Sequence, residues 1–146
     1  GSKQQGQGPW MWGITLKQLM KIEREPEYRP SFTMREVVEH VIKPRTAGTG
    51  MGYALLKNNA QPLMAAAMVS HAWDEIYKDF LFGLESTHEK GPFWVCATAI
   101  YQPEDIPDLT IKRQLGPHPA VGPFAAVLRQ AEVMICCVTE ACNIYT

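Results

Sequence analysis

The chain has 146 residues, of which 46% are hydrophobic and 20% are charged. This length and composition predict one ordinary globular unit rather than a disordered segment. The formal net charge is -1 and the basic residues are scattered among acidic neighbours, so we expect no nucleic-acid partner. No apolar run approaches the roughly 20 residues that span a bilayer, and we therefore expect no transmembrane segment.

The four cysteines are expected to be reduced, packed thiols, which indicates an intracellular, reducing compartment. Three of them lie in or beside apolar runs, and the adjacent pair Cys136 and Cys137 has poor geometry for a disulfide framework. No CxxC-like spacing exists, so we expect no metal site. Caspase-like hydrolases place a nucleophilic cysteine just past a strand, whereas this pair falls inside a predicted strand and Cys142 lacks a flanking glycine.

Two amphipathic helices are expected near the N-terminus. Residues 15–18 and residues 33–36 both read as capping boxes, in which a threonine hydroxyl and a side chain three residues later bond each other's backbone. We expect the first helix to end before Pro26, because the proline ring removes a backbone donor. The apolar pattern of residues 34–42 continues the second helix, and Pro44 is expected to stop it.

The glycine-rich residues 46–52 are expected to form a linker. A glycine cluster could also cradle a phosphate, but this one lacks the Lys-Ser/Thr ending of a P-loop. We therefore divide the chain into residues 1–61, a polar tail and a two-helix extension with this linker, and residues 62–146, an α/β segment.

In the second part, strands are expected to alternate with helices. Short apolar runs predict strands at residues 63–69, 93–100 and 133–138. Helices are predicted to follow Asp74, to span residues 110–115, and to start again at Pro123. This alternation predicts the α/β class, with a short parallel sheet flanked by helices and an N-terminal helical extension.

The richest candidate site follows the first strand. Ligands of open parallel sheets bind beyond the carboxyl ends of the strands, where we expect residues 70–75, 101–105 and 139–142. The ligand-binding candidates are Ser70, His71, Trp73, Asp74 and Glu75. The imidazole could act as a general base and the indole could stack on a ring. The alternative is structural: Ser70 and Asp74 cap a helix, Trp73 packs against the sheet, and His71 bonds a loop.

Two further tryptophans, Trp10 and Trp12, are the candidates for an interaction surface. They lie in an apolar segment that could anchor the chain to another protein or cover the domain's own core. The sequence leaves both alternatives open.

Residues 62–146 resemble the first half of a TIR-like (Toll/interleukin-1 receptor) or fungal HET-like domain. Val69-Ser70 with Asp74-Glu75 is similar to the family's first strand-end loop, and residues 128–139 are similar to a later helix and strand. His71 departs from the family, which usually has an aromatic residue there. Residues 52–146 also resemble a group of dinoflagellate-type proteins with a Met-Val-Ser-His-Ala-Trp-Asp-Glu block, to which no activity is attached.

The TIR-like resemblance implies a TIR/flavodoxin-like fold, incomplete in this chain, and two functions. Active TIR enzymes cleave NAD with a glutamate in a Trp-Cys-x-x-Glu motif, and no position of this chain matches it. We therefore carry over no catalytic residue and leave enzyme activity undecided. The missing acid, an exposed edge of the expected sheet and the apolar residues 9–12 favour a non-catalytic interaction or assembly module with a protein partner or a second copy. The alternative is a truncated NAD-cleaving or nucleotide-binding domain, with NAD as the candidate cofactor.

Such a sheet normally has five strands, and three are expected here. Three parallel strands leave an edge that can pair with another chain. We expect either that the natural polypeptide continues past Thr146, or that a partner or the N-terminal helices complete the sheet.

Overall fold

The computed structural model describes residues 8–117, 122–131 and 133–136. Its N-terminal part is helical, with segments η2 (Pro9–Met11), α1 (Leu16–Lys21), η3 (Ile22–Arg24), α2 (Met34–Val37), η4 (Val38–Ile42), α3 (Lys43–Thr46) and α4 (Tyr53–Lys57). The remainder alternates strands with helices: β1 (Ala67–Ser70), α5 (Tyr77–Ser86), β2 (Phe93–Val95), α6 (Cys96–Ala99), η5 (Pro107–Leu109), α7 (Ile111–Leu115), α8 (Pro123–Gln130) and β3 (Val133–Cys136). The predicted α/β class is confirmed.

Both predicted capping boxes are present. The hydroxyl of Thr15 accepts the N–H of Gln18 at 3.0 Å, and the Gln18 side chain accepts the N–H of Thr15 at 3.1 Å. Thr33 and Glu36 repeat this exchange at the start of α2. Each box satisfies donors that the first turn of a helix leaves unpaired, which fixes where these helices begin. The first helix ends with η3, ahead of Pro26 as predicted.

The prediction that Pro44 stops the second helix is wrong. The chain runs from α2 through η4, a π-helical turn, into α3, where Pro44 occupies the first turn. The wider turn accommodates a residue without a backbone donor. Side chains bond two nearby carbonyls: Arg45 Nη1 donates to Val41 at 3.2 Å, and Thr46 Oγ1 donates to Ile42 at 2.8 Å.

The strands are shorter than predicted. The expected strand at residues 63–69 is observed as β1, which has only four residues and lies toward the C-terminal end of the predicted range. The expected strand at residues 93–100 ends after three residues, and α6 begins at Cys96. A short apolar run does not distinguish a buried strand from a buried helical turn, which explains this error. Of the third expected strand, residues 133–136 form β3 and the last two residues lie outside the described part of the chain.

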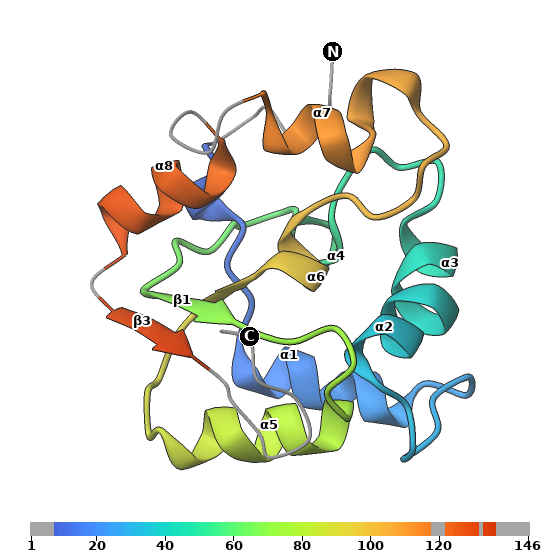
Figure 1. Cartoon of the computed structure of the whole chain (residues 1–146), viewed down its shortest axis with the longest axis vertical. Coiled ribbons are helices and arrows are strands. Elements are labelled where there is room, and N and C mark those ends of the chain that lie inside the picture. The colour runs from blue at the N-terminus through green and yellow to red at the C-terminus, as the bar shows by residue number, and fades with distance from the viewer. Residues whose placement is uncertain (1–7, 118–121, 132, 137–146) are drawn as a thin grey trace.

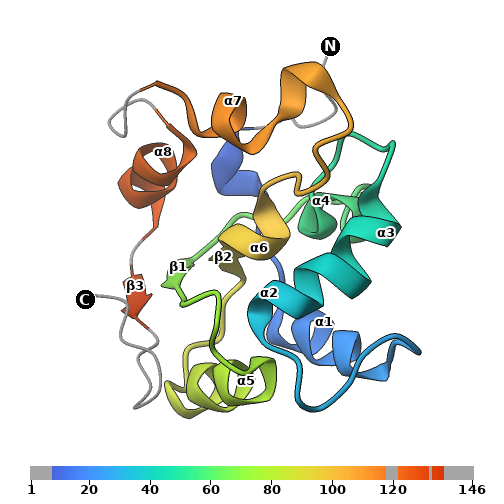
Figure 2. The same ribbon diagram turned by 45° about the vertical axis from the view of Figure 1, so that its right-hand side comes forward.

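The three strands form a parallel sheet in the order β2-β1-β3. Val69 in the central strand lies opposite Val95 of β2 and Ile135 of β3. The crossover helices α5 and α8 lie on opposite sides of the strands (Figures 1 and 2). The first crossover runs from β1 to β2, and the second runs back from β2 past β1 to β3. Two crossovers of the same hand that run in opposite directions place their helices on opposite faces of a sheet.

Each face of the sheet has its own apolar cluster. Val69 packs with Phe80 of α5 on one face, and Met68 packs with Val127 of α8 on the other. The N-terminal helices contribute to the first cluster, and Ile14 exchanges two 2.8 Å backbone hydrogen bonds with Phe93 of β2. The described N-terminal residues and the α/β segment therefore share one core.

Candidate functional site

A cavity of about 260 Å³ lies at the carboxyl ends of β1 and β2. Its walls come from β1 and the loop after it, from the start of α6 and from α8: Met68, Val69, Ser70, His71, Trp73, Cys96 and Phe124. The structure thus brings together Ser70, His71 and Trp73 among the five ligand-binding candidates. This is the position at which ligands of open α/β sheets bind.

The loop that carries these residues is held by the start of α2. The backbone N–H of Met34 donates to the carbonyl of Glu75 at 2.8 Å, and that of Arg35 donates to Trp73 at 2.9 Å. Donors in the first turn of a helix have no partner within the helix, so they are free to make such bonds. These two hydrogen bonds therefore fix the backbone of the loop that follows β1 at the carboxyl end of the sheet.

His71 is an uncharged imidazole in an aromatic environment. Its ring lies edge to face with Trp73 at a centroid distance of 4.9 Å and with Phe80 at 5.9 Å. Burial lowers the pKa of His71 to about 4, against a smaller opposing contribution from the backbone of Ala72. Its Nδ1 atom is buried and has no hydrogen-bond partner in the described part of the chain. An unpaired buried polar atom costs free energy, and such atoms in native structures call for an explanation.

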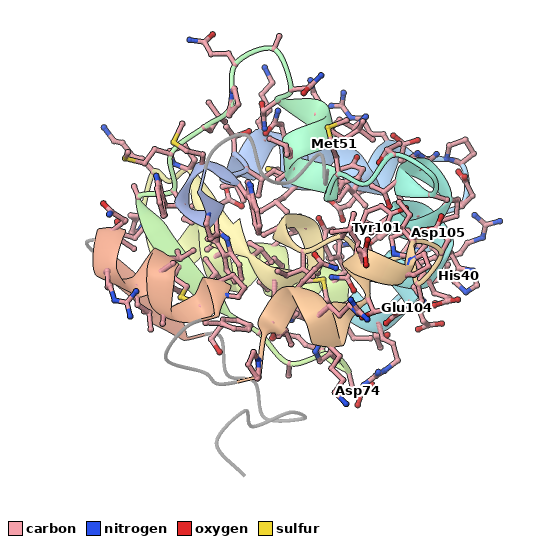
Figure 3. All side chains as sticks on the ribbon, turned by 90° about the horizontal axis from the view of Figure 1, so that it is seen from above. His40, Met51, Asp74, Tyr101, Glu104 and Asp105 are labelled. Atoms are coloured by element: carbon pink, nitrogen blue, oxygen red, sulfur yellow. The ribbon has the colours of Figure 1, made fainter. Side chains whose placement is uncertain are left out.

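Asp74 points away from the cavity. Its carboxylate accepts from Arg35 Nε at 3.1 Å, and the two side chains are 72% and 62% exposed. Figure 3 shows Asp74 at the margin of the molecule. The N-cap of α5 is Ile76, without a side-chain cap, so the alternative in which Ser70 and Asp74 cap this helix is wrong.

Glu75 is buried, with 3% of its surface exposed, but it does not line the cavity. Its Oε1 atom has no hydrogen-bond partner among the described residues. Burial, reinforced by the nearby charge of Asp79, raises the pKa of Glu75 to about 7. The carboxyl is therefore largely protonated in mildly acidic solution and divided between its two forms near neutral pH, since burial favours the uncharged form.

The segment 101–105, predicted at the same edge, has a different role. The hydroxyl of Tyr101 donates to Asp105 Oδ1 at 2.6 Å, and the N–H of Gly48 donates to Asp105 Oδ2 at 2.8 Å. Because β2 ends early and α6 intervenes, this segment bonds the glycine-rich loop and does not line the cavity. Tyr101 and Asp105 lie close to each other in Figure 3. The third predicted segment, 139–142, lies outside the described residues.

Four lining residues were not among the sequence candidates: Met68 and Val69 of β1, and also Cys96 and Phe124. Cys96 was assigned to a strand interior, and Phe124 comes from a helix that only the fold brings to this edge. Burial raises the pKa of the Cys96 thiol to about 11, so it is protonated and a poor nucleophile. In the described part of the chain, no three potential ligands gather into a metal site.

The two tryptophans proposed as interaction anchors differ in position. Trp12 is 7% exposed and packs in the cluster with Met68, Trp94 and Val127. Trp10 is half-buried, and its carbonyl accepts the N–H of Ala65 at 2.8 Å. For Trp12, the structure selects the alternative in which this segment covers the domain's own core.

The chain matches no family model, no curated protein and no solved structure in comparisons with known proteins. Among the helices of the described residues, none has the length and apolar character needed to cross a membrane.

Proposed function

We propose that this chain is a binding domain that holds a small, ring-containing molecule in the strand-end cavity without reacting with it. The observation that carries the proposal is a strand-end cavity lined by Trp73, Phe124 and the uncharged imidazole of His71. Trp73 and Phe124 supply ring surfaces for stacking.

The strand order supports this location. An order of β2-β1-β3 is the one with which flavodoxin-like sheets begin, and their ligand binds beyond the carboxyl end of β1, at its border with β3. Ser70 and His71 follow that strand. This agreement also supports the TIR/flavodoxin-like fold, which remains a proposal resting on topology and on the resemblance of residues 62–146.

The chemical groups favour binding over catalysis. An imidazole with a pKa near 4 is a weak general base, and a thiol with a pKa near 11 is a weak nucleophile. NAD cleavage would need an acid at the reacting bond, and the carboxyl of Glu75 lies outside the cavity lining. Binding of one ring of a nucleotide-like molecule is the part of the NAD hypothesis that the cavity supports.

The test is a screen of small ring compounds against the protein, read by NMR from the indole N–H signals of Trp73 and Trp94. Binding in the cavity should shift the Trp73 signal, and Ser70→Leu, which fills part of the cavity, should abolish the shift. His88→Asn is the matched control, because His88 is exposed, lies outside the lining and has a φ of 60° that asparagine tolerates. A screen without any Ser70-dependent shift contradicts the proposal.

An interaction module is the second candidate function. Phe82 on α5 is 74% exposed, and Leu128 on α8 is 46% exposed. A contiguous exposed apolar patch is a feature of protein interfaces. Because α5 and α8 lie on opposite sides of the strands, Phe82 and Leu128 belong to separate surfaces. If α5 binds a second copy through Phe82, sedimentation should show mass rising with concentration, and Phe82→Ser should abolish that rise. A monomer at all concentrations argues against self-association.

A further inference from the structure

We propose that the strand-end cavity selects an uncharged planar ring and rejects the anionic and cationic forms of the same ring. This inference rests on the proposed binding function and adds the charge class of the ligand. It excludes a ligand whose phosphate or carboxylate sits inside the cavity.

The described residues of the lining carry no formal charge. Its polar side chains are the Ser70 hydroxyl, the His71 imidazole and the Cys96 thiol, and the others are apolar or aromatic. Burial keeps both titratable groups neutral, since it lowers the pKa of His71 to about 4 and raises that of Cys96 to about 11. A charge that enters such a site loses its hydration without gaining a counter-ion, which is costly.

The chain outside the described residues offers little to compensate an anion. Residues 118–121, 132 and 137–146 contain no lysine or arginine, and residues 1–7 contain only Lys3. Arg35, whose backbone bonds the loop that carries Trp73, has its guanidinium paired with Asp74 at 3.1 Å. That cation is already neutralised by a carboxylate and is turned to solvent.

The polar side chains of the lining favour a ligand that can both donate and accept hydrogen bonds. The hydroxyl of Ser70 can do either, and a neutral imidazole has one donor and one acceptor nitrogen. A carboxamide or an amino-substituted heteroaromatic edge matches these groups. The edge-to-face pair of His71 and Trp73 provides an aromatic wall beside them.

The experiment compares one ring in three charge states: benzamide, benzoate and benzamidinium, together with neutral, anionic and cationic sets built on one- and two-ring scaffolds. Binding is read from the Trp73 indole signal, so that only the cavity is scored. We expect the neutral compounds to bind at least about tenfold more tightly than both charged forms, a difference of about 1.4 kcal/mol.

A charge-introducing variant sharpens the test. Phe124 is 37% exposed on α8 and lines the cavity, so Phe124→Lys places an ammonium there on a helix surface that tolerates it. We expect this variant to gain affinity for benzoate by about tenfold or more. Leu128→Lys, one helical turn further on and outside the lining, is the matched control and should leave the preference for the neutral ring unchanged.

The outcomes separate the two proposals. A charged ring that binds in the cavity as tightly as its neutral form, with its shift lost in Ser70→Leu, overturns the charge selectivity and leaves the binding function standing. Absence of any Trp73 shift across all sets overturns the binding function itself. Neutral binding that is unaffected by Phe124→Lys and equally unaffected by Ser70→Leu places the ligand elsewhere and overturns both.

Discussion

The hydroxyl of Tyr77 donates a 2.6 Å hydrogen bond to the backbone carbonyl of Leu19. Tyr77 begins α5, Leu19 lies in α1, and neither residue has exposed surface. Burial raises the pKa of Tyr77 well above its usual value of 10, so the hydroxyl remains a donor. This bond joins the N-terminal helices to the crossover helix of the sheet.

Tyr77→Phe is expected to lower the free energy of unfolding by about 1–2 kcal/mol, because the carbonyl of Leu19 loses its bond to this hydroxyl in a water-free site. Urea denaturation measures the change. Tyr28→Phe is the matched control: its hydroxyl reaches Glu23 at only 3.5 Å, and its loss should have a smaller effect. Equal midpoints for Tyr77→Phe and the wild type would show that the bond contributes no stability.

Glu75 is expected to make the protein less stable as the pH rises. Its pKa is raised from 4.5 to about 7, so the folded state binds more protons than the unfolded state between those values. The free energy of unfolding therefore falls across that interval, and the stabilising contribution is complete only below it. Glu75→Gln, which mimics the protonated acid, should gain about 1–3 kcal/mol at about pH 8 and little at about pH 4.5.

Thermal unfolding followed at a series of pH values checks this expectation. Glu85→Gln is the control, because Glu85 is exposed on α5. This variant should show the same pH dependence of stability as the wild type. Asp79→Asn should weaken the effect, since its charge is one cause of the raised pKa. A Glu75→Gln protein that gains the same stability at every pH would contradict this assignment.

Alanine at two glycines should have opposite effects. A Cβ on Gly52 would lie 2.3 Å from the carbonyl oxygen of Ala99, whereas a Cβ on Gly83 would have no neighbour within 4 Å. We expect Gly52→Ala to destabilise by about 2–3 kcal/mol through overpacking. Gly83 lies inside α5, where alanine should stabilise by about 0.5–1 kcal/mol. Unfolding midpoints of the two variants test the pair, and a shift in the same direction contradicts it.

The Cys96 thiol should react slowly with iodoacetamide in the folded protein. A pKa of about 11 leaves few thiolates in mildly alkaline solution. We expect alkylation at about pH 8 to be roughly 100-fold slower than in urea-unfolded protein, as read by mass mapping of the Cys96 peptide. Equal rates in the two states would mean that this thiol is neither buried nor raised in pKa. A ring bound in the cavity should slow the reaction further.

Local signals were the most predictable part of this fold. The capping boxes at Thr15 and Thr33 depend on contacts three residues apart, and both are present. The stop at Pro44 failed because a π-helical turn absorbs the proline, an adjustment that a rule about α-helices does not contain. The predicted end of β2 was also wrong, because apolar residues 93–100 fit a buried strand and a buried helical turn equally well.

The part of the candidate site that follows directly from the end of β1 was predicted from the sequence. Ser70, His71 and Trp73 follow β1 and reach the cavity. Phe124 is brought there by a crossover helix, so its place depends on tertiary packing that the sequence pattern does not contain. The segment 101–105 was misplaced because the error at the end of β2 moved its expected position to the sheet edge.

The bridge between Ile14 and Phe93 determines which edge of the sheet can accept a further strand. Both outward backbone groups of Phe93 bond Ile14, and the carbonyl of Val95 accepts the hydroxyl of Thr98 at 3.1 Å. Of the two edges formed by the described residues, the β2 edge is therefore occupied, and an added strand can join beside β3. Two copies that met through such a single edge would form a closed, two-fold pair, because neither would present a second edge for an open-ended stack.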